Sequence, residues 1–81
     1  MARVLLFGPL RDLAGWRERT FDPSPASLSE LRRRLAAEDA ALGEAIAAPG
    51  VQVALDQAIV RGEATLTPTS EVAFLPPMSG G

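Results

Sequence analysis

The chain ends in two glycines, Gly80 and Gly81, and the chemistry that these residues can support is that of a terminal carboxylate. Glycine has no Cβ, so a narrow passage can admit both residues and a nucleophile can approach the terminal carbonyl. A free carboxylate is a poor acyl donor until a leaving group such as AMP is attached. An amine that attacks the acyl-adenylate gives a conjugate, and a sulfur source gives a thiocarboxylate.

The side chains offer little competing chemistry. The sequence has no His, Cys or Tyr, and all eight of its basic residues are arginines. The usual nucleophiles and neutral-pH proton carriers are therefore absent. Serine and threonine have no histidine or lysine to activate them, and thiolate or imidazole ligation of a metal is excluded. We predict that the chain is not catalytic alone and that the terminal carboxylate is its reactive group.

No phosphate-binding loop is present, so we expect this chain to bind no cofactor. ATP-Mg would be used by a separate activating enzyme. The formal net charge is −2, and the aromatic residues do not alternate with arginines, so a nucleic-acid partner is not expected. No apolar run has the length of a membrane span and no leader pattern is visible, which makes the cytoplasm the expected compartment.

The 81 residues allow one domain, and 47% apolar residues are too many for a disordered peptide. Five segments have the composition of β-strands and are bounded by turn residues. These predicted strands are residues 1–7, 17–21, 51–55, 59–60 and 71–75. We expect residues 10–16 to be a connector and residues 56–58 to be a turn.

One helix has a clear start. Ser27 followed by Glu30 forms a capping box, in which each side chain satisfies a backbone N–H of the first turn. Leu28, Leu31 and Leu35 then form one apolar stripe, so the helix is predicted over 28–38. Residues 40–46 can add a further turn or two before Pro49-Gly50 ends the helical stretch.

Two strands, a helix and then two or three strands are typical of an α+β protein with one helix over one face of a mixed sheet. We predict a β-grasp (ubiquitin-like) fold with four to five strands and one main helix. The first and last strands should be neighbours in the middle of the sheet. Residues 1–75 would form the domain, and residues 76–81 an extended functional tail.

The tail begins with two prolines, Pro76 and Pro77. Each has a fixed φ and confines the residue before it to extended geometry, so the tail should leave the last strand as a stiff arm. Six residues reach roughly 20 Å at full extension. Met78 is the one large side chain that could anchor the tail in a partner, and Ser79 precedes the two glycines.

Alternation in the first and last strands divides their residues between two faces. One face should pack on the helix, and its predicted core residues are Val4, Leu6, Val72 and Phe74 with Leu28, Leu31 and Leu35. The other face should expose an apolar patch near the start of the tail. We assign Phe7, Ile59 and Leu75 to that patch, which is expected to bind a partner protein.

Residues 71–81, EVAFLPPMSGG, resemble the C-terminal signature of the small subunits of molybdopterin synthases, within the MoaD/ThiS sulfur-carrier family. Residues 4–15, VLLFGPLRDLAG, are similar to the family's first strand and following loop. The length also suits the family, so the resemblance extends over the whole chain.

The resemblance implies a β-grasp fold and a specific reaction. Gly81 would be adenylated by a ubiquitin-activating-like enzyme and converted to a thiocarboxylate, while Gly80 keeps the passage narrow. The tail would insert into the large catalytic subunit and deliver sulfur to cyclic pyranopterin monophosphate, forming the dithiolene of molybdopterin. The residues expected to contact partners are Phe7, Ile59, Leu75, Pro76, Pro77, Met78 and Ser79.

Other functions remain open at this point. The chain could carry sulfur for thiazole or another metabolite, although the two prolines and the Phe-Leu strand end argue against thiazole. It could be a ubiquitin-like modifier whose Gly81 is joined to lysines of other proteins. The absence of lysine is compatible with that, because such a chain could not be joined to itself through side chains. A plain binding module with an inert tail is the remaining alternative.

Overall fold

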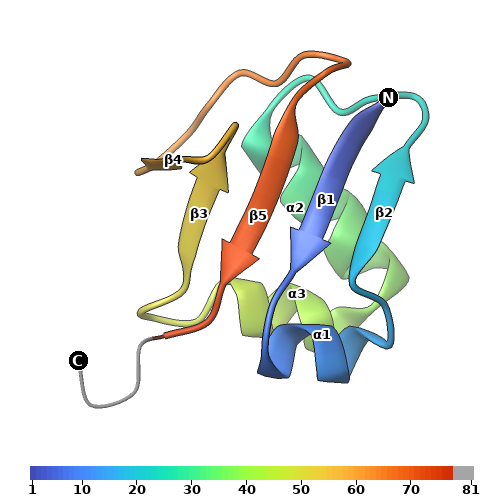
Figure 1. Cartoon of the computed structure of the whole chain (residues 1–81). Helices are drawn as coiled ribbons and strands as arrows, with labels where there is room; N and C mark the ends of the chain where they lie inside the picture. Colours follow the sequence, from blue (N-terminus) through green and yellow to red (C-terminus); the bar gives the residue numbers. More distant parts are fainter. Residues whose placement is uncertain (78–81) are drawn as a thin grey trace.

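The computed structural model describes residues 1–77 as one five-stranded sheet with helices on one face (Figure 1). The strand order across the sheet is β2-β1-β5-β3-β4. The elements are β1 (Ala2–Leu6), α1 (Pro9–Ala14), β2 (Glu18–Phe21), α2 (Leu28–Glu38), α3 (Ala40–Ile46), β3 (Gln52–Leu55), β4 (Ala58–Val60) and β5 (Glu71–Leu75).

The first and last strands form the middle of the sheet, as predicted. β1 and β5 are parallel, with Val4 opposite Val72 and Leu6 opposite Phe74. The remaining three pairings are antiparallel, which makes the sheet mixed. Because β5 has a neighbour on each side, the strand that leads into the tail is held by two ladders of hydrogen bonds.

The main helix begins where the capping box predicts. The Ser27 Oγ accepts a hydrogen bond from the backbone N–H of Glu30 at 3.2 Å. The Glu30 carboxylate accepts from the backbone N–H of Ala26 at 2.8 Å, one residue earlier than the motif predicts. The predicted span of 28–38 is confirmed, and the leucine stripe faces the sheet.

Two local predictions are wrong. Residues Pro9–Ala14, within and beside the expected connector, form α1. Proline fits the first turn of a helix, where its missing N–H is not needed, so Pro9 begins this helix rather than preventing one. The turn between β3 and β4 contains only Asp56 and Gln57, and Ala58 belongs to β4. Residues 40–46 form α3, a separate short helix.

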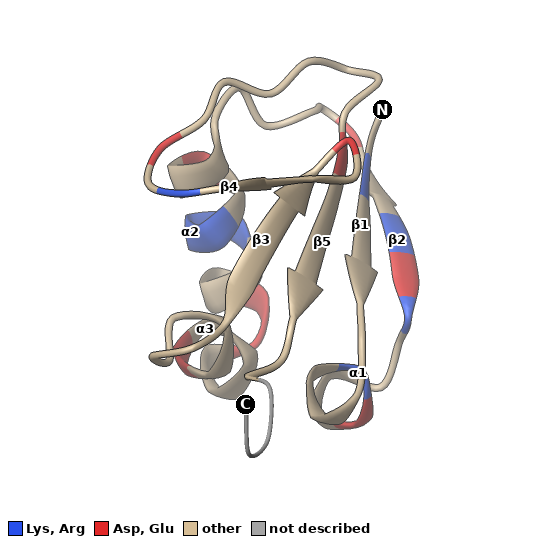
Figure 2. Ribbon diagram, turned by 60° about the vertical axis from the view of Figure 1, so that its left-hand side comes forward, with Lys and Arg blue, Asp and Glu red and all other residues tan. Residues whose placement is uncertain are grey.

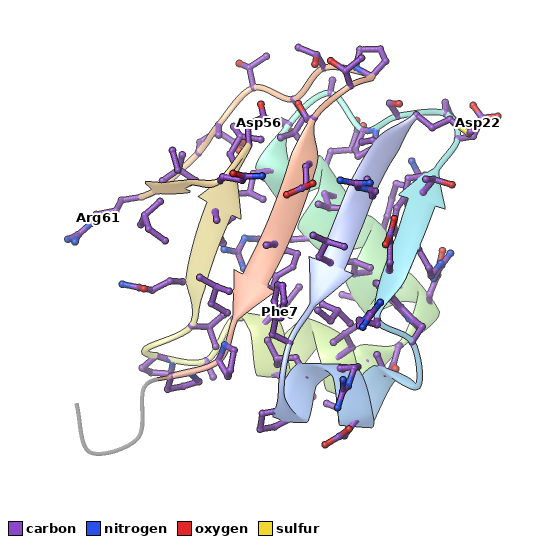
Figure 3. All side chains as sticks on the ribbon, in the orientation of Figure 1. Phe7, Asp22, Asp56 and Arg61 are labelled. Carbon is purple, nitrogen blue, oxygen red and sulfur yellow. The ribbon has the colours of Figure 1, made fainter. Side chains whose placement is uncertain are left out.

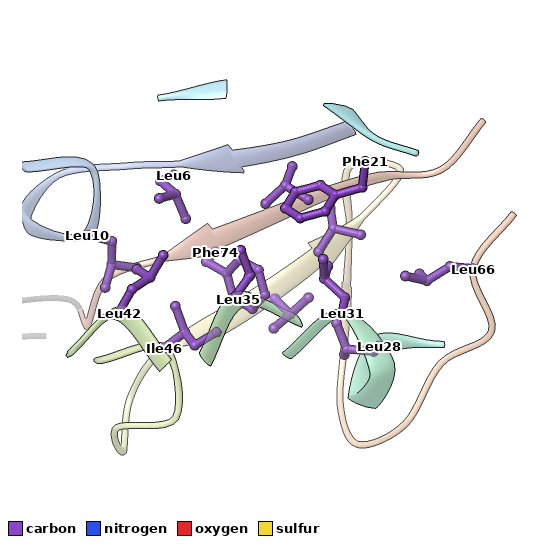
Figure 4. Close-up of a cluster of buried hydrophobic side chains, with 13 residues drawn as sticks. Leu6, Leu10, Phe21, Leu28, Leu31, Leu35, Leu42, Ile46, Leu66 and Phe74 are labelled. Carbon is purple, nitrogen blue, oxygen red and sulfur yellow. The ribbon is translucent and has the colours of Figure 1, made fainter. Parts of the chain in front are cut away.

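All seven residues predicted for the core are buried between the sheet and the helices (Figure 4). Alternation in β1 and β5 identified four of them, and the apolar stripe of α2 identified the three leucines. The core also contains six residues that were not predicted: Leu10, Phe21, Leu42, Ile46, Val53 and Leu66. No helix in residues 1–77 combines the length and the apolar character needed to cross a bilayer.

Candidate functional site

The start of the tail lies where three segments of the chain meet. β5 ends at Leu75, and a Cβ placed on Gly8 would be 3.2 Å from Cγ of Pro76. A Cβ placed on Gly50 would be 3.0 Å from Cβ of Pro77. Each proline therefore lies directly against the backbone of a glycine.

These two glycines sit in the connections at the tail end of the sheet. Gly8 joins β1 to α1 with φ 56°, and Gly50 lies between α3 and β3 with φ 90°. Both conformations are left-handed, which glycine adopts without a steric cost. The tail thus leaves the body between the β1–α1 and α3–β3 connections, and Figure 1 shows both beside the end of β5.

The remaining predicted tail residues, Met78, Ser79, Gly80 and Gly81, lie outside the described part of the chain. The structure therefore describes where the tail begins but not the position of the predicted reactive group. Pro76 is half-buried and Pro77 is exposed.

The predicted apolar patch lies on the face of the sheet opposite the helices. Phe7 is 42% exposed and Ile59 is 47% exposed, whereas Leu75 is half-buried. Figure 3 shows Phe7 where β1 ends, beside the end of β5. Phe7 and Leu75 lie at the tail end of this open face. Ile59, on the edge strand β4, is further from the tail because it pairs with Ala54 in the middle of β3.

Three residues connect the two parts of the patch. Ile59 is opposite Ala54, Ala54 is opposite Ala73, and Ala73 is opposite Leu5, so one row crosses four strands. Ala73 is only 7% exposed, so the exposed part of this row consists of Leu5 and Ala54, which are half-buried, and the exposed Ile59. Leu5 and Ala73 could have been found from the sequence, because the same alternation that exposes Phe7 and Leu75 places them on this face.

On β1 and β5 the charged residues of the open face lie at the end away from the tail, whereas the edge strand β2 has Glu18 opposite Leu5. Arg3 is hydrogen bonded to Glu71, and its Nη1 is 3.6 Å from Oε2 of Glu18. In Figure 2, β3 has no charged residue and β5 is charged only at its start, away from the tail. Along β1 and β5 the face therefore changes from ionic to apolar toward the tail, which suits the burial of its tail end against another protein.

The acidic side chains of residues 1–77 are spread over the body. No group of three or more acidic, histidine or cysteine side chains there could hold a metal ion. The pKa of Glu63 is lowered by hydrogen bonds, chiefly from the Ser29 hydroxyl, and that of Glu38 is lowered by a hydrogen bond from Arg19. Both carboxylates cap or brace α2, far along the chain from the prolines.

The body thus presents a proline arm, two glycines against it and an apolar face beside it. The family model described as ThiS matches residues 4–81, nearly the whole chain. The chain belongs to the ThiS family.

Relatives of this ThiS-family chain agree with that assignment. The molybdopterin synthase sulfur carrier subunit of Escherichia coli (strain K12) is 31% identical over 81 residues, which is 100% of each chain. The predicted membership of the MoaD/ThiS group is confirmed. The chain is a sulfur carrier of this type with a ubiquitin-like fold.

Two solved structures establish the fold independently. The solution structure of the small archaeal modifier protein 1 from Methanosarcina acetivorans has a TM-score of 0.83 at 24% identity, covering 99% of this chain and 95% of that one. The crystal structure of SAMP1 from Haloferax volcanii has a TM-score of 0.81 at 22% identity, covering 99% and 98%. The predicted β-grasp fold is therefore confirmed.

Proposed function

We propose that this chain is the sulfur-carrying small subunit of a molybdopterin synthase. The observation that carries the proposal is the match to the E. coli sulfur carrier subunit along the full length of both chains. The sequence supports it, because a proline-stiffened arm ending in Gly-Gly follows the central strand of a body without catalytic side chains.

The proposed reaction begins at the carboxylate of Gly81. A partner enzyme transfers AMP from ATP-Mg to this carboxylate and releases pyrophosphate. Hydrosulfide delivered by a sulfur donor then attacks the acyl carbon, the bond to the AMP oxygen breaks and AMP leaves, and loss of the proton gives a thiocarboxylate. This chain contributes the acyl group and the access to it, since Gly80 and Gly81 place no side chain beside the carbonyl.

In the second half of the proposed cycle, the large subunit binds the carrier and takes up its tail. The thiocarboxylate sulfur attacks a side-chain carbon of cyclic pyranopterin monophosphate and displaces an oxygen substituent there, which gives a thioester to Gly81. Water then cleaves the acyl carbon–sulfur bond, which leaves the sulfur on the pterin and returns Gly81 to a carboxylate. A second loaded carrier supplies the second sulfur of the dithiolene. The apolar end of the open face, with Phe7 and Leu75, is the surface that best fits the large subunit because it adjoins the arm. Burying this surface supplies binding free energy without any contact to the reacting atoms.

The same architecture would serve a carrier for thiazole or another sulfur metabolite, or a protein modifier. A modifier is compatible with the absence of lysine, because copies of this chain could not be linked to one another through side chains. These alternatives differ from the proposal in what attacks the activated Gly81, or in what receives its sulfur.

The test is in two steps. First, the intact mass of chain made in a host with the sulfur pathway should show one terminal oxygen replaced by sulfur, and a variant lacking Gly81 should not. A plain carboxylate in sulfur-fed cells would contradict every carrier function. Second, the thiocarboxylate form should convert the precursor pterin to molybdopterin when mixed with a large subunit. Sulfur loading without this conversion would favour another carrier function, and lysine conjugates would favour a modifier.

A further inference from the structure

Four glycines of the described chain have a positive φ, and they fall into two kinds. Gly15 and Gly62, with φ 83° and 79°, have nothing within 4 Å of an added Cβ. Gly8 and Gly50 face the two prolines of the arm at 3.2 and 3.0 Å. Carbon atoms normally make contact at about 3.5–4.0 Å, so a side chain at either position would push on a proline. The positive φ favours glycine at all four positions, but only at Gly8 and Gly50 is there a second reason, the close approach of a proline.

We propose that Gly8 and Gly50 are positioning residues that seat Pro76 and Pro77 and so set the direction in which the tail leaves the sheet. The expected effect on sulfur loading rests on the proposed function, whereas the expected effect on the direction of the tail does not. We call these two glycine–proline contacts the seat. Gly8 contacts Pro76 and Gly50 contacts Pro77, so the seat acts at two successive residues of the arm. Two contacts fix a direction, whereas one contact would fix only a point.

The prolines make the direction persist. Leu75 and Pro76 each precede a proline, which confines both to extended geometry, and each ring fixes its own φ. Four residues follow Pro77 and, extended in a partner's tunnel, they would span about 13 Å. A shift of a few tenths of an ångström at Pro77 would then be enlarged several-fold at Gly81.

A partner must engage the apolar face and the tail at the same time. When the tail leaves the sheet in the native direction, docking of Phe7 and Leu75 would bring Gly81 to the reacting atoms. With the arm tilted, the face could still dock but the acyl carbon would be misplaced. Misplacement by about 1 Å can cost a hundredfold in rate, so the defect should appear at the chemical step rather than in affinity.

The experiment compares Gly50→Ala with Gly62→Ala. Both substitutions put a Cβ at a left-handed position, so both should lower the urea midpoint to a similar extent. Only Gly50→Ala meets a proline. We expect the NMR signals of Pro77 and its cross-peaks to residue 50 to shift in this variant alone. With saturating activating enzyme, its thiocarboxylation rate should fall roughly tenfold while partner affinity changes less than twofold.

A second pair, Gly8→Ala against Gly15→Ala, tests the contact of Gly8 with Pro76 and replaces the first pair if Gly50→Ala does not fold. Gly8 has ψ −134° and Gly15 has ψ 10°, so this pair is compared by the signals of Pro76 and by the rate, not by the urea midpoint. Unchanged proline signals, or equal rates in a seat variant and its control, would overturn the proposal. If no chain accepts sulfur, including the unaltered one, the proposed function fails. The NMR signals of Pro76 and Pro77 in the glycine variants would then be the only test of the seat.

Discussion

The guanidinium of Arg19 joins the edge strand β2 to the last turn of α2, with its Nη1 2.6 Å from Oε1 of Glu38. The same guanidinium lies over the rings of Trp16 and Phe21, at 5.2 and 4.8 Å from their centroids. One arginine thus braces the sheet edge against the helix and covers part of Phe21, a buried core residue.

This bridge predicts a pH dependence of stability. The hydrogen bond from Arg19 lowers the pKa of Glu38 in the folded chain. The stabilisation is therefore present above the unfolded pKa of a glutamate, about 4.3, and is lost as the pH falls through the lower folded value. Glu38→Gln should reduce the free energy of unfolding at neutral pH by less than about 1 kcal/mol, because the pair is exposed. The difference from the unaltered chain should vanish in acid.

Urea unfolding between neutral pH and pH 3 measures this effect. Glu44→Gln is the control, since the Glu44 side chain makes no hydrogen bond or ion pair within residues 1–77. A constant difference between Glu38→Gln and the unaltered chain at all pH values would show that the bridge is not the cause.

The turn between β3 and β4 predicts a stabilising substitution. Asp56 and Gln57 have φ of 49° and 71°, the geometry of a two-residue hairpin turn whose preferred second residue is glycine. The Asp56 carboxylate also accepts a hydrogen bond from the backbone N–H of Glu71 at 2.9 Å, so Asp56 should be kept. Gln57→Gly should raise the free energy of unfolding by about 0.5–1 kcal/mol.

Ala58→Gly serves as the control for that prediction. Ala58 lies in β4, where glycine gains no conformational relief and weakens the strand. The two variants should move the urea midpoint in opposite directions, and a loss of stability in both would contradict the strain at Gln57.

The contact between α2 and α3 predicts a destabilising substitution. A Cβ on Gly43 would lie 2.5 Å from Cβ and 2.7 Å from Cα of Ala36, so the two helices would have to separate. Gly43→Ala should lower the free energy of unfolding by about 1–3 kcal/mol, although alanine is the better helix former. Thermal unfolding monitored by circular dichroism measures it.

Ala36→Gly removes the closer of these two contacts, the one with Cβ, but leaves the 2.7 Å approach to Cα of residue 36. The double variant should therefore be more stable than the sum of the two single effects predicts, because part of the clash needs a Cβ at both positions. If the two substitutions change the free energy of unfolding additively, the helices accommodate the added Cβ at residue 43 without a loss of stability, and the clash is not the cause.

The apolar end of the open face predicts a binding defect without a folding defect. Phe7→Ala should weaken binding to the large subunit about tenfold or more, as the loss of an aromatic at the centre of an interface does. Leu75→Asp should act in the same direction through an unpaired buried charge. A titration by calorimetry measures the affinity, and the urea midpoint of Phe7→Ala should stay close to that of the unaltered chain.

Leu13→Ala is the matched control, because Leu13 is 49% exposed and lies on α1 rather than on the open face. Equal loss of affinity in Phe7→Ala and Leu13→Ala would move the interface from the sheet to α1. Unchanged affinity in Phe7→Ala and Leu75→Asp would remove the open face from the interface.

The sequence predicts those parts of the fold that depend on local pattern. The capping box at Ser27 locates the main helix, and alternation in β1 and β5 identifies both the core and the exposed face. It does not predict α1, because six residues are too few for helical periodicity and Pro9 is also typical of a turn.

The contacts at the base of the arm could not be predicted for a different reason. Gly8 and Gly50 each stand beside a proline in the sequence and so indicate only the end of an element. Their role at Pro76 and Pro77 depends on the parallel pairing of β1 with β5 and on the path from α3 into β3. Such contacts join distant parts of the chain, and no local pattern records them.

The central position of β5 has a mechanical consequence. A pull on the tail acts along a strand that is bonded on both sides, to β1 in parallel and to β3 in antiparallel orientation. Such a load shears two ladders together instead of opening hydrogen bonds one after another from an edge. A tail attached to an edge strand such as β4 would peel that strand away. Withdrawal of the arm from a tight passage should therefore leave this body folded and ready for another round.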